Sequence, residues 1–414
     1  MLFIYRISIN ILLIISPIIL IYRLIIGKED LKRFKEKFCF FSKEKRGGNL
    51  IWFHGASVGE LYSIMPLLEK LEKNKKISQI LVTSNTLSSS KIIQNYRFKR
   101  LIHQFFPIDT NFHSKKFLDY WKPSSAYFID SEIWPNMIDN LNKKNIPIIL
   151  LNGRITKKTF NRWKMISSFS KKIFEKFNLC LSSSKESKKY LKSLGATNVK
   201  LLGNIKFSQL ENEKNTLNNK IKKFIKSKKT WCASSTHGPE EIFCAKVHLE
   251  LKRKYKNLLT IIIPRHVERA KSIEENLNKL DLKVYLHNSQ KIIDKRTDIY
   301  LVDSYGETKS FYNNCKNIFL GGSLVNHGGQ NPLEAARFGC NILHGPNVSN
   351  FAEIYQFLKL KKISMKISNQ KQFVTMIDKF FKKKSNSKLI KKKLNFIGKK
   401  ILDSTYREIN TIIK

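Results

Sequence analysis

Acidic side chains directly follow two apolar segments of this sequence, where they could exchange a proton with a substrate. The run His54–Glu60 (HGASVGE) follows the first segment, and its small residues would let a ligand approach the backbone. Glu60 is a candidate proton acceptor, although a glutamate in a first helical turn also simply favours the helix dipole. Asp130 and Glu132 follow a later apolar segment. They suit a polar site and a capped helix almost equally well.

Candidate ligands for an anion follow other apolar segments. Arg154 and Lys206 stand at such positions, and either alone is also typical of a charged surface. Arg265 follows a strongly apolar segment, and a guanidinium binds phosphate through two parallel hydrogen bonds. Further candidates for substrate contacts are the hydroxyl groups of Ser57, Ser234, Ser235 and Thr236. Helix capping explains most hydroxyl clusters of this kind.

The most specific signal is the run 321–334, GGSLVNHGGQNPLE. One glycine pair, with candidate contacts at Gly322 and Ser323, follows an apolar segment, and a second pair precedes a helix that carries Glu334. Two such pairs with a carboxylate on the first helical turn indicate a sugar nucleotide. The phosphate would lie on backbone amides and the ribose on the carboxylate.

Metal catalysis has little support in the sequence. The histidines nearest to these motifs are far apart, and none shows the spacing of a metal-binding pair: His54, His237, His266 and His327. A phosphate-binding lysine motif of the Walker type is also absent from the sequence. We therefore expect neither a metal ion nor another cofactor.

Short apolar segments that alternate with amphipathic ones place these residues on a fold. The predicted strands of the first half are Leu50–His54, Gln79–Thr83, Ala126–Ile129, Ile146–Leu151, Leu179–Ser182 and Lys200–Leu202. Those of the second half are Thr230–Ala233, Leu259–Ile263, Lys283–Leu286, Ile299–Val302, Asn317–Leu320 and Asn341–Leu343. Helical patterns lie between them, for example Leu61–Glu72 and Asn136–Lys143. The alternation predicts two doubly wound, Rossmann-like α/β domains that face a cleft, with ligands beyond the carboxyl ends of the strands.

The predicted boundaries follow from these patterns. We expect an N-terminal anchor at 1–28, a first Rossmann-like domain at 29–207 and a polar linker at 208–229. A second Rossmann-like domain at 230–385 and C-terminal helices at 386–414 complete the chain.

The N-terminal segment predicts contact with a membrane. The segment Ile7–Tyr22 contains no charged residue, and its length is slightly short for a membrane-spanning helix. Arg6 and Arg23 could extend the span, because their long side chains can reach the two membrane interfaces. Many lysines follow, so the rest of the chain should stay in the cytoplasm. A buried core helix and a cleaved signal peptide are the alternatives.

Composition narrows the class of partner. The chain has 414 residues and a formal net charge of +45, so we expect an anionic partner such as nucleic acid, an anionic membrane or a phosphorylated substrate. A codon bias toward lysine would produce part of the same excess. The 42% hydrophobic content excludes wholesale disorder. Six scattered cysteines argue against a disulfide scaffold.

Taken in order, these motifs resemble those of the bacterial 3-deoxy-D-manno-octulosonic acid (Kdo) transferases. The resemblance covers nearly the whole chain and rests on HGASVGE, SEIWPN, NGRIT, GNIKF, ASSTHGPEE, PRHVER, YGE, GGSLVNHGGQNPLEAA and GPNVSNFAEI. It implies a GT-B fold, an inner-membrane location and an inverting glycosyltransferase in lipopolysaccharide core synthesis. That enzyme would move Kdo from CMP-Kdo to the lipid A precursor lipid IVA. Chains of this kind could add one, two or more Kdo residues.

The resemblance also assigns roles to individual residues. The general base falls on Glu60, and the groups that support the transition state fall on Glu132 and Lys206. Lys206 could hold either Glu132 or a substrate anion. The residues implied to bind CMP are Pro264, Arg265, Tyr305, Gly306, Glu307, Asn331, Pro332, Leu333 and Glu334. The expected partners are then CMP-Kdo, lipid IVA and anionic inner-membrane lipids, without nucleic acid.

Two other functions fit part of the sequence. A GT-B transferase or epimerase acting on a UDP-sugar would share the architecture, but would not explain the apolar N-terminus together with HGASVGE and NPLE. A nucleic-acid-binding protein would explain the lysine-rich segment Lys379–Lys400. The sequence carries no known nucleic-acid-binding signature, which argues against that class.

Overall fold

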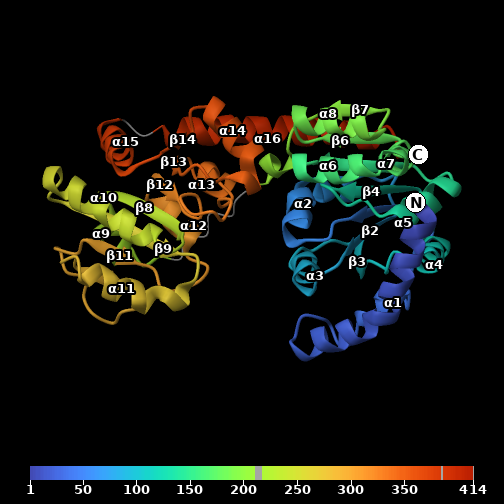
Figure 1. Cartoon of the computed structure of the whole chain (residues 1–414), viewed down its shortest axis with the longest axis horizontal. Helices are drawn as coiled ribbons and strands as arrows, with labels where there is room; N and C mark the ends of the chain where they lie inside the picture. The colour runs from blue at the N-terminus through green and yellow to red at the C-terminus, as the bar shows by residue number, and fades with distance from the viewer. Residues whose placement is uncertain (210–216, 384–385, 414) are drawn as a thin grey trace. The chain divides into compact units, whose positions relative to one another are not determined.

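The structure is a computed structural model that describes residues 1–209, 217–383 and 386–413 (Figure 1). The chain forms two compact units. Unit 1 comprises Met1–Gln209 and Ile397–Lys414, and unit 2 comprises Leu210–Phe396.

Unit 1 is built on a seven-stranded parallel sheet with the order β3-β2-β1-β4-β5-β6-β7. Its strands are β1 Leu50–His54, β2 Gln79–Ser84, β3 Leu101–Phe105, β4 Ser125–Ile129, β5 Ile148–Gly153, β6 Leu179–Ser182 and β7 Val199–Leu201. Each strand of the β1–β4 pair is buried along its whole length, as expected when helices cover both faces of a sheet.

The helices of unit 1 cover its sheet. They are α2 Val58–Glu72, α3 Leu87–Gln94, α4 Asn111–Trp121, α5 Pro135–Lys143, α6 Lys157–Met165, α7 Ser167–Phe174 and α8 Lys185–Leu194, with short 3₁₀ turns at Phe34–Phe38 and Ile205–Ser208. One core cluster joins Trp52 and Phe128 of the sheet to Trp121 of α4, Leu141 of α5 and Phe174 of α7. This core fixes the strand ends from which the site residues project.

Unit 2 repeats the same architecture. Its parallel sheet has the order β10-β11-β9-β8-β12-β13-β14. The strands are β8 Lys229–Thr236, β9 Leu258–Pro264, β10 Val284–Leu286, β11 Ile299–Leu301, β12 Asn317–Leu320, β13 Asn341–His344 and β14 Ser364–Lys366. The two sheets together confirm the predicted pair of doubly wound α/β domains.

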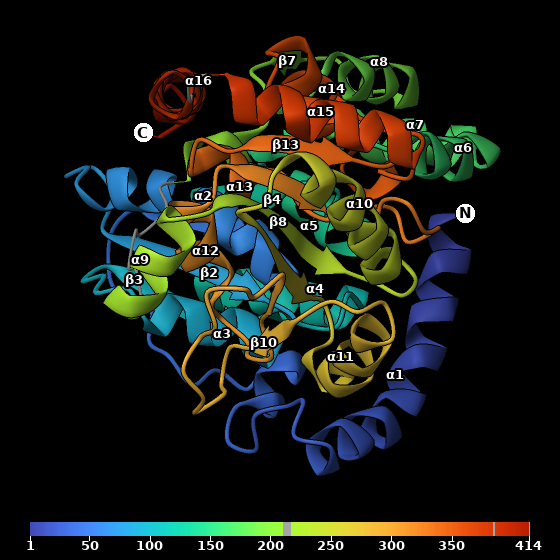
Figure 2. The ribbon, with the colours of Figure 1, turned by 90° about the vertical axis from the view of Figure 1, so that its left-hand side faces the viewer.

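The helices of unit 2 are α9 Asn219–Lys226, α10 Glu240–Lys254, α11 Ala270–Asn278, α12 Thr308–Asn314, α13 Leu333–Arg337, α14 Ala352–Leu360 and α15 Gln370–Lys382, with 3₁₀ turns at Val267–Arg269 and Ser349–Phe351. Helices α10 and α15 lie side by side (Figure 2). Phe373 of α15 packs on Trp231 of β8, with ring centroids 5.1 Å apart, in the core of this unit.

The C-terminal segment, expected as separate helices at 386–414, is one helix, α16 Ser387–Asn410, and it belongs to both units. Its later part packs on unit 1, where Lys70 of α2 donates to Asp403 at 2.6 Å. The expected linker at 208–229 contains α9, and its residues 210–216 lie outside the described residues.

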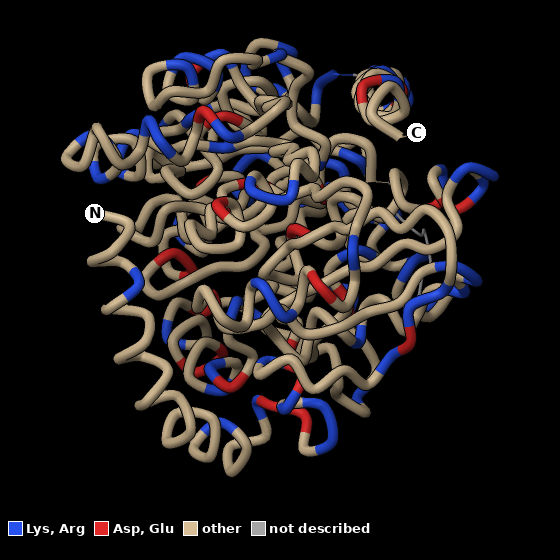
Figure 3. The backbone as a smooth tube through the Cα atoms, turned by 90° about the vertical axis from the view of Figure 1, so that its right-hand side faces the viewer, with Lys and Arg blue, Asp and Glu red and all other residues tan. Residues whose placement is uncertain are grey.

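The apolar N-terminal segment forms α1 Leu2–Ile25, which is long and apolar enough to cross a membrane. It carries almost no charge along its length (Figure 3), and Leu20 is its buried residue. The location of Arg6 and Arg23 at two membrane interfaces stays a prediction. In the structure, Arg6 donates from Nε to Asn136 at 3.0 Å and from Nη2 to Asp139 at 3.1 Å, which ties the first turns of α1 to α5. Arg23 pairs with Glu29 at 2.6 Å.

Candidate active site

The turn between β1 and α2 holds Glu60 through a capping box. Ser57 is the N-cap residue, and its hydroxyl accepts a hydrogen bond from the Glu60 N–H at 3.4 Å. In return, Oε2 of Glu60 accepts the N–H groups of Ala56 at 2.6 Å and Ser57 at 3.2 Å. Glu60 therefore does cap its helix, as the structural alternative predicted. Both bonds fall on Oε2, and Oε1 receives no hydrogen bond from the described residues.

The surroundings of Glu60 favour its protonated form. Burial, together with the nearby carboxylates of Glu132 and Asp130, raises the pKa of Glu60 to about 7, against the opposing hydrogen bonds from Ser57. A carboxyl group with a pKa near neutrality is well matched to accept a proton during catalysis. Capping and acid–base chemistry are thus compatible in this residue, because they use different oxygens.

Asp130 lies at the end of β4 in a strained backbone conformation. Its φ angle is +56°, in the left-handed region, and that of the neighbouring Asn152 is +53°. The side chain of Asn152 donates to Oδ1 of Asp130, and Lys206 Nζ donates to Oδ2 at 2.8 Å. Two non-glycine residues held in this region and joined by a hydrogen bond fit a site in which geometry is maintained at a cost in stability.

Glu132 has a separate set of contacts. The indole Nε1 of Trp134 donates to its Oε2 at 2.8 Å, and Nε2 of His54 lies 3.3 Å from the same oxygen. The His54 ring stacks on Phe106 at 3.9 Å between centroids, so its position is fixed by the core. The carboxylate of Glu132 is therefore oriented by two aromatic side chains.

The structure thus gathers Glu60, Glu132 and Lys206 at the carboxyl ends of the strands of unit 1, as the sequence predicted. Asp130, noted in the sequence but given no role, is the partner of Lys206. Asn152 was missed, although it directly follows a predicted strand. Of the other candidates, Arg154 donates its N–H to the Asp130 carbonyl at 3.0 Å.

In unit 2 the corresponding turn, between β8 and α10, carries Glu240. This carboxylate is 1% exposed and accepts four backbone N–H groups. Oε2 accepts from His237 at 3.0 Å and Gly322 at 2.7 Å, and Oε1 accepts from Ser323 at 3.1 Å and Leu324 at 2.9 Å. Glu240 thereby fixes the first glycine pair of the run 321–334.

This arrangement corrects the prediction that the first glycine pair holds a phosphate on its amides. The N–H groups of Gly322 and Ser323 already bond Glu240. Gly321 serves close packing, because a Cβ there would lie 2.5 Å from the Ser235 carbonyl oxygen. The Ser234 hydroxyl, also a candidate contact, is buried and hydrogen-bonded to Tyr312 at 2.8 Å.

Other donor-site candidates remain accessible. Arg265 is exposed after β9, and Tyr305 is 64% exposed, with its hydroxyl donating to Glu268 at 3.1 Å. Glu334 lies on the first turn of α13, where Lys309 Nζ approaches its Oε1 at 3.6 Å. Three of the remaining candidates are buried: Pro264, Pro332 and Leu333. Four others are at least partly exposed: Ser235, Gly306, Glu307 and Asn331. Thr236 is buried, and its hydroxyl lacks a partner among the described residues.

Three histidines meet at this edge of unit 2: the ring of His237 lies 4.3 Å from that of His327 and 5.8 Å from that of His266, between centroids. Burial and the nearby His327, His266 and Arg269 side chains lower the pKa of His237. Within the described part of the chain, no group of three or more His, Cys, Asp or Glu side chains is arranged to hold a metal ion. All six cysteines are free and buried.

The two doubly wound parallel units have the architecture of the GT-B fold. Solved structures of this fold include a putative UDP-N-acetylglucosamine 2-epimerase from Listeria monocytogenes, which matches 88% of this chain and 97% of its own length at 11% identity and a TM-score of 0.59. UDP-GlcNAc 2-epimerase from Neisseria meningitidis, bound to UDP-GlcNAc, matches 87% of this chain and all of its own length at 12% identity and a TM-score of 0.57. At such low identity these similarities show the fold alone.

Sequence relatives decide the family. Residues 32–209 match the family model described as 3-Deoxy-D-manno-octulosonic-acid transferase (kdotransferase). The chain is 34% identical over 410 residues to 3-deoxy-D-manno-octulosonic acid transferase of Rickettsia bellii, covering 97% of this chain and 96% of the relative. The Haemophilus influenzae enzyme of the same name is 30% identical over 84% of both chains. The chain belongs to the family of Kdo transferases, which are glycosyltransferases.

Proposed function

We propose that this protein transfers Kdo from CMP-Kdo to a hydroxyl group of lipid IVA, with inversion at the anomeric carbon, in lipopolysaccharide core synthesis. The observation that carries this proposal is Glu60. Its carboxyl group has a pKa of about 7, is held at Oε2 by two amides and leaves Oε1 without a hydrogen bond from the described residues. Inversion in a single displacement needs one base on the acceptor side, and Glu60 has the properties of such a base.

The reaction balances with one proton acceptor. The acceptor oxygen forms a bond to the anomeric carbon, and its proton passes to Oε1 of Glu60. The bond from that carbon to the phosphate oxygen of CMP breaks, and its electron pair leaves with the phosphate. Because the donor passes through an oxocarbenium-like state, a nearby negative charge would stabilise it. Glu132, oriented by Trp134 and His54, is our candidate for that charge.

Lys206 supplies a positive charge beside the acidic residues Glu60, Asp130 and Glu132. Its ion pair with Asp130 keeps one buried carboxylate neutralised, so that the repulsion acting on Glu60 stays limited. We therefore assign Lys206 a supporting role through Asp130, and we add Asp130 and Asn152 to the site as positioning residues.

The donor is proposed to bind unit 2. Arg265 would take the CMP phosphate and Glu334 the ribose, with Tyr305, Gly306, Glu307 and Asn331 around them. The backbone N–H groups of Gly322 and Ser323 are left out of this proposal, because Glu240 occupies them. CMP is a monophosphate leaving group, so a guanidinium can offset its charge.

We propose that α1 anchors the chain to the bacterial inner membrane, with both units in the cytoplasm. The support is its long apolar surface, on which Ile14, Ile18 and Ile25 are each more than 70% exposed. The bonds of Tyr5 to Asp109 and of Arg6 to α5 hold its first turns on unit 1. Those contacts favour a helix that lies along the membrane surface over one that crosses it.

Transfer of labelled Kdo tests the proposal directly. The purified full-length chain is incubated with lipid IVA and either CMP-Kdo or a set of UDP-sugars, and labelled lipid is separated by chromatography. We expect label in the lipid with CMP-Kdo alone. Transfer from a UDP-sugar, or interconversion of UDP-sugars without transfer, would support the other GT-B function instead.

A further inference from the structure

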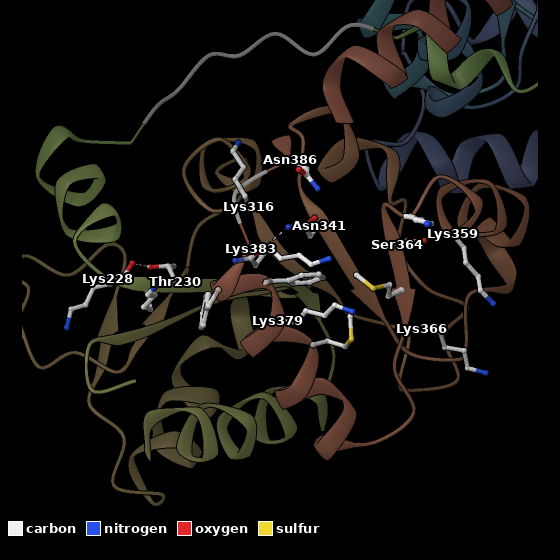
Figure 4. A pocket seen from close by; sticks show the side chains of 17 residues that line it. Lys228, Thr230, Lys316, Asn341, Lys359, Ser364, Lys366, Lys379, Lys383 and Asn386 are labelled. Atoms are coloured by element: carbon white, nitrogen blue, oxygen red, sulfur yellow. Dashed lines mark hydrogen bonds between the residues drawn. The ribbon is translucent and has the colours of Figure 1, made fainter. Parts of the chain in front are cut away.

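A cavity in unit 2 opens at the amino ends of its strands, at the edge of the sheet opposite to Arg265 and the glycine-rich run 321–334. Its volume is about 850 Å³, and its wall includes the starts of β8, β12, β13 and β14 together with the end of α15 (Figure 4). Because parallel strands all point the same way, this edge is separate from the proposed donor site. The reaction proposed above makes no use of it.

The cavity is strongly cationic. Of its 17 lining residues, eight are lysines and none is acidic. The whole chain has 77 Lys and Arg and 32 Asp and Glu among 414 residues. At these frequencies, a set of 17 residues would contain about three basic residues and one acidic residue. A codon bias raises lysine everywhere and does not remove acids from one cavity. The enrichment is therefore local.

Most of the lysines of this cavity, six of the eight, lack a carboxylate partner within the described part of the chain. No described carboxylate lies within ion-pair distance of six of the lysines: Lys229, Lys359, Lys362, Lys366, Lys379 and Lys383. On the neighbouring surface the opposite holds, since Asp378 pairs with both Lys254 and Lys382. Uncompensated like charges repel one another, and a bound anion would relieve that repulsion.

Apolar side chains line the same cavity. Phe380 is 8% exposed, and Phe381, Met365 and Met376 are half-buried among the lysine stems. Lys229 Nζ lies over the Phe381 ring at 5.9 Å. Ammonium groups at the rim and an apolar wall between them fit a ligand that has an anionic head and an apolar part.

We propose that this cavity binds the phosphate head group of an anionic phospholipid. It would form a second membrane contact, in unit 2, besides α1. A soluble phosphate compound shares the head-group chemistry, but would leave the apolar wall without a partner. The inference does not depend on the transfer reaction.

Lysine modification tests this assignment on the full-length chain. The protein is mixed with vesicles of phosphatidylcholine, or of equimolar phosphatidylcholine and phosphatidylglycerol, and treated with an amine-reactive reagent before mass spectrometry. We expect phosphatidylglycerol to slow the modification of Lys366, Lys379 and Lys383 several-fold. Glycerol phosphate without vesicles is a third arm. If it protects these lysines as well as the anionic vesicles do, the lipid assignment is wrong.

Matched variants separate the cavity from general charge. The triple variant Lys366→Gln, Lys379→Gln and Lys383→Gln loses the same charge as a control with Lys271→Gln, Lys279→Gln and Lys291→Gln, which are exposed residues outside the cavity. At low salt we expect the cavity variant to bind the anionic vesicles on the order of a hundredfold more weakly, with the control within a few-fold of wild type. Equal losses in both variants would overturn the proposal. Thermal unfolding checks that both variants remain folded.

Discussion

Glu60 and Glu240 each follow the first strand of a seven-stranded parallel sheet, yet their carboxylates are bound differently. Glu60 follows β1, which lies between β2 and β4, and Glu240 follows β8, which lies between β9 and β12. Glu60 accepts two N–H groups on one oxygen. Glu240 accepts four, two on each oxygen.

The difference shows that a buried carboxylate can be fully satisfied by hydrogen bonds, and we therefore propose the role of base for Glu60 and not for Glu240. Glu240 is almost fully buried, but its charge is satisfied by the amides of a loop, so its role is to hold that loop. Glu60 has fewer hydrogen bonds, and burial together with two acidic neighbours raises its pKa to about 7. The two units thus present one glutamate that holds a loop and one, Glu60, that we propose acts as the base.

The largest expected effect is on catalysis by Glu60→Gln. An amide still accepts the two N–H groups but cannot take a proton, so we expect kcat to fall about 10²- to 10⁴-fold, with donor binding largely kept. Kdo transfer to lipid IVA and equilibrium binding of CMP-Kdo measure the two effects. Glu69→Gln, an exposed change on the same helix, is the matched control. Full activity of the Glu60→Gln variant would remove Glu60 from the role of base.

The reciprocal change, Glu240→Gln, should affect stability. One amide oxygen replaces two charged acceptors, so two of the four N–H groups lose their partner, and we expect a cost of about 3 kcal/mol in the free energy of unfolding. Denaturant unfolding measures it, with the exposed Glu275→Gln as control. A loss no larger than that of the control would mean that Glu240 does not hold the loop.

The variant Glu132→Gln tests the influence of the acidic neighbours on the pKa of Glu60, through the pH dependence of the reaction. Glu132 raises the pKa of Glu60, so its neutralisation should lower that pKa. A base acts when deprotonated, and the rise of kcat/KM with pH should therefore begin at lower pH in the variant, whatever its overall rate. Parallel pH profiles of variant and wild type provide the test, and a shift to higher pH would exclude the proposed coupling.

The smallest expected effect is that of metal removal. The leaving group is a monophosphate that Arg265 can neutralise, so transfer should persist in excess EDTA. Rates before and after chelation, each with and without added Mg²⁺, measure this. A loss of activity that Mg²⁺ restores would contradict the expectation.

The twelve strands predicted from apolar runs all occur, with ends that differ by at most three residues. The two strands that were missed have other properties. β3 (LIHQF) contains His103 and Gln104, two polar residues that are buried, and a hydropathy pattern therefore does not detect the strand; His103 is hydrogen-bonded to Ser84 at 2.8 Å. β14 is three residues long and pairs only at the edge of its sheet.

Single candidate residues of the site could be predicted from sequence motifs, but the contacts between residues that are distant in the sequence could not. Glu60, Glu132 and Lys206 were identified from their motifs. The contact between Lys206 and Asp130 joins residues 76 positions apart, and that between Glu240 and Ser323 joins residues 83 apart. Such pairs depend on which strands become neighbours, and this cannot be read from the spacing of residues in the sequence. For this reason, the prediction that the amides of Gly322 and Ser323 are available to a phosphate was wrong.

The pH dependence of kcat/KM for Kdo transfer by the wild-type chain tests the central claim most directly. With Glu60 as base and a pKa of about 7, kcat/KM should increase tenfold per pH unit below that value and level off above it. A profile that is flat from about pH 5 to 8, or one that levels off near the ordinary pKa of a glutamate at about 4.3, would contradict it.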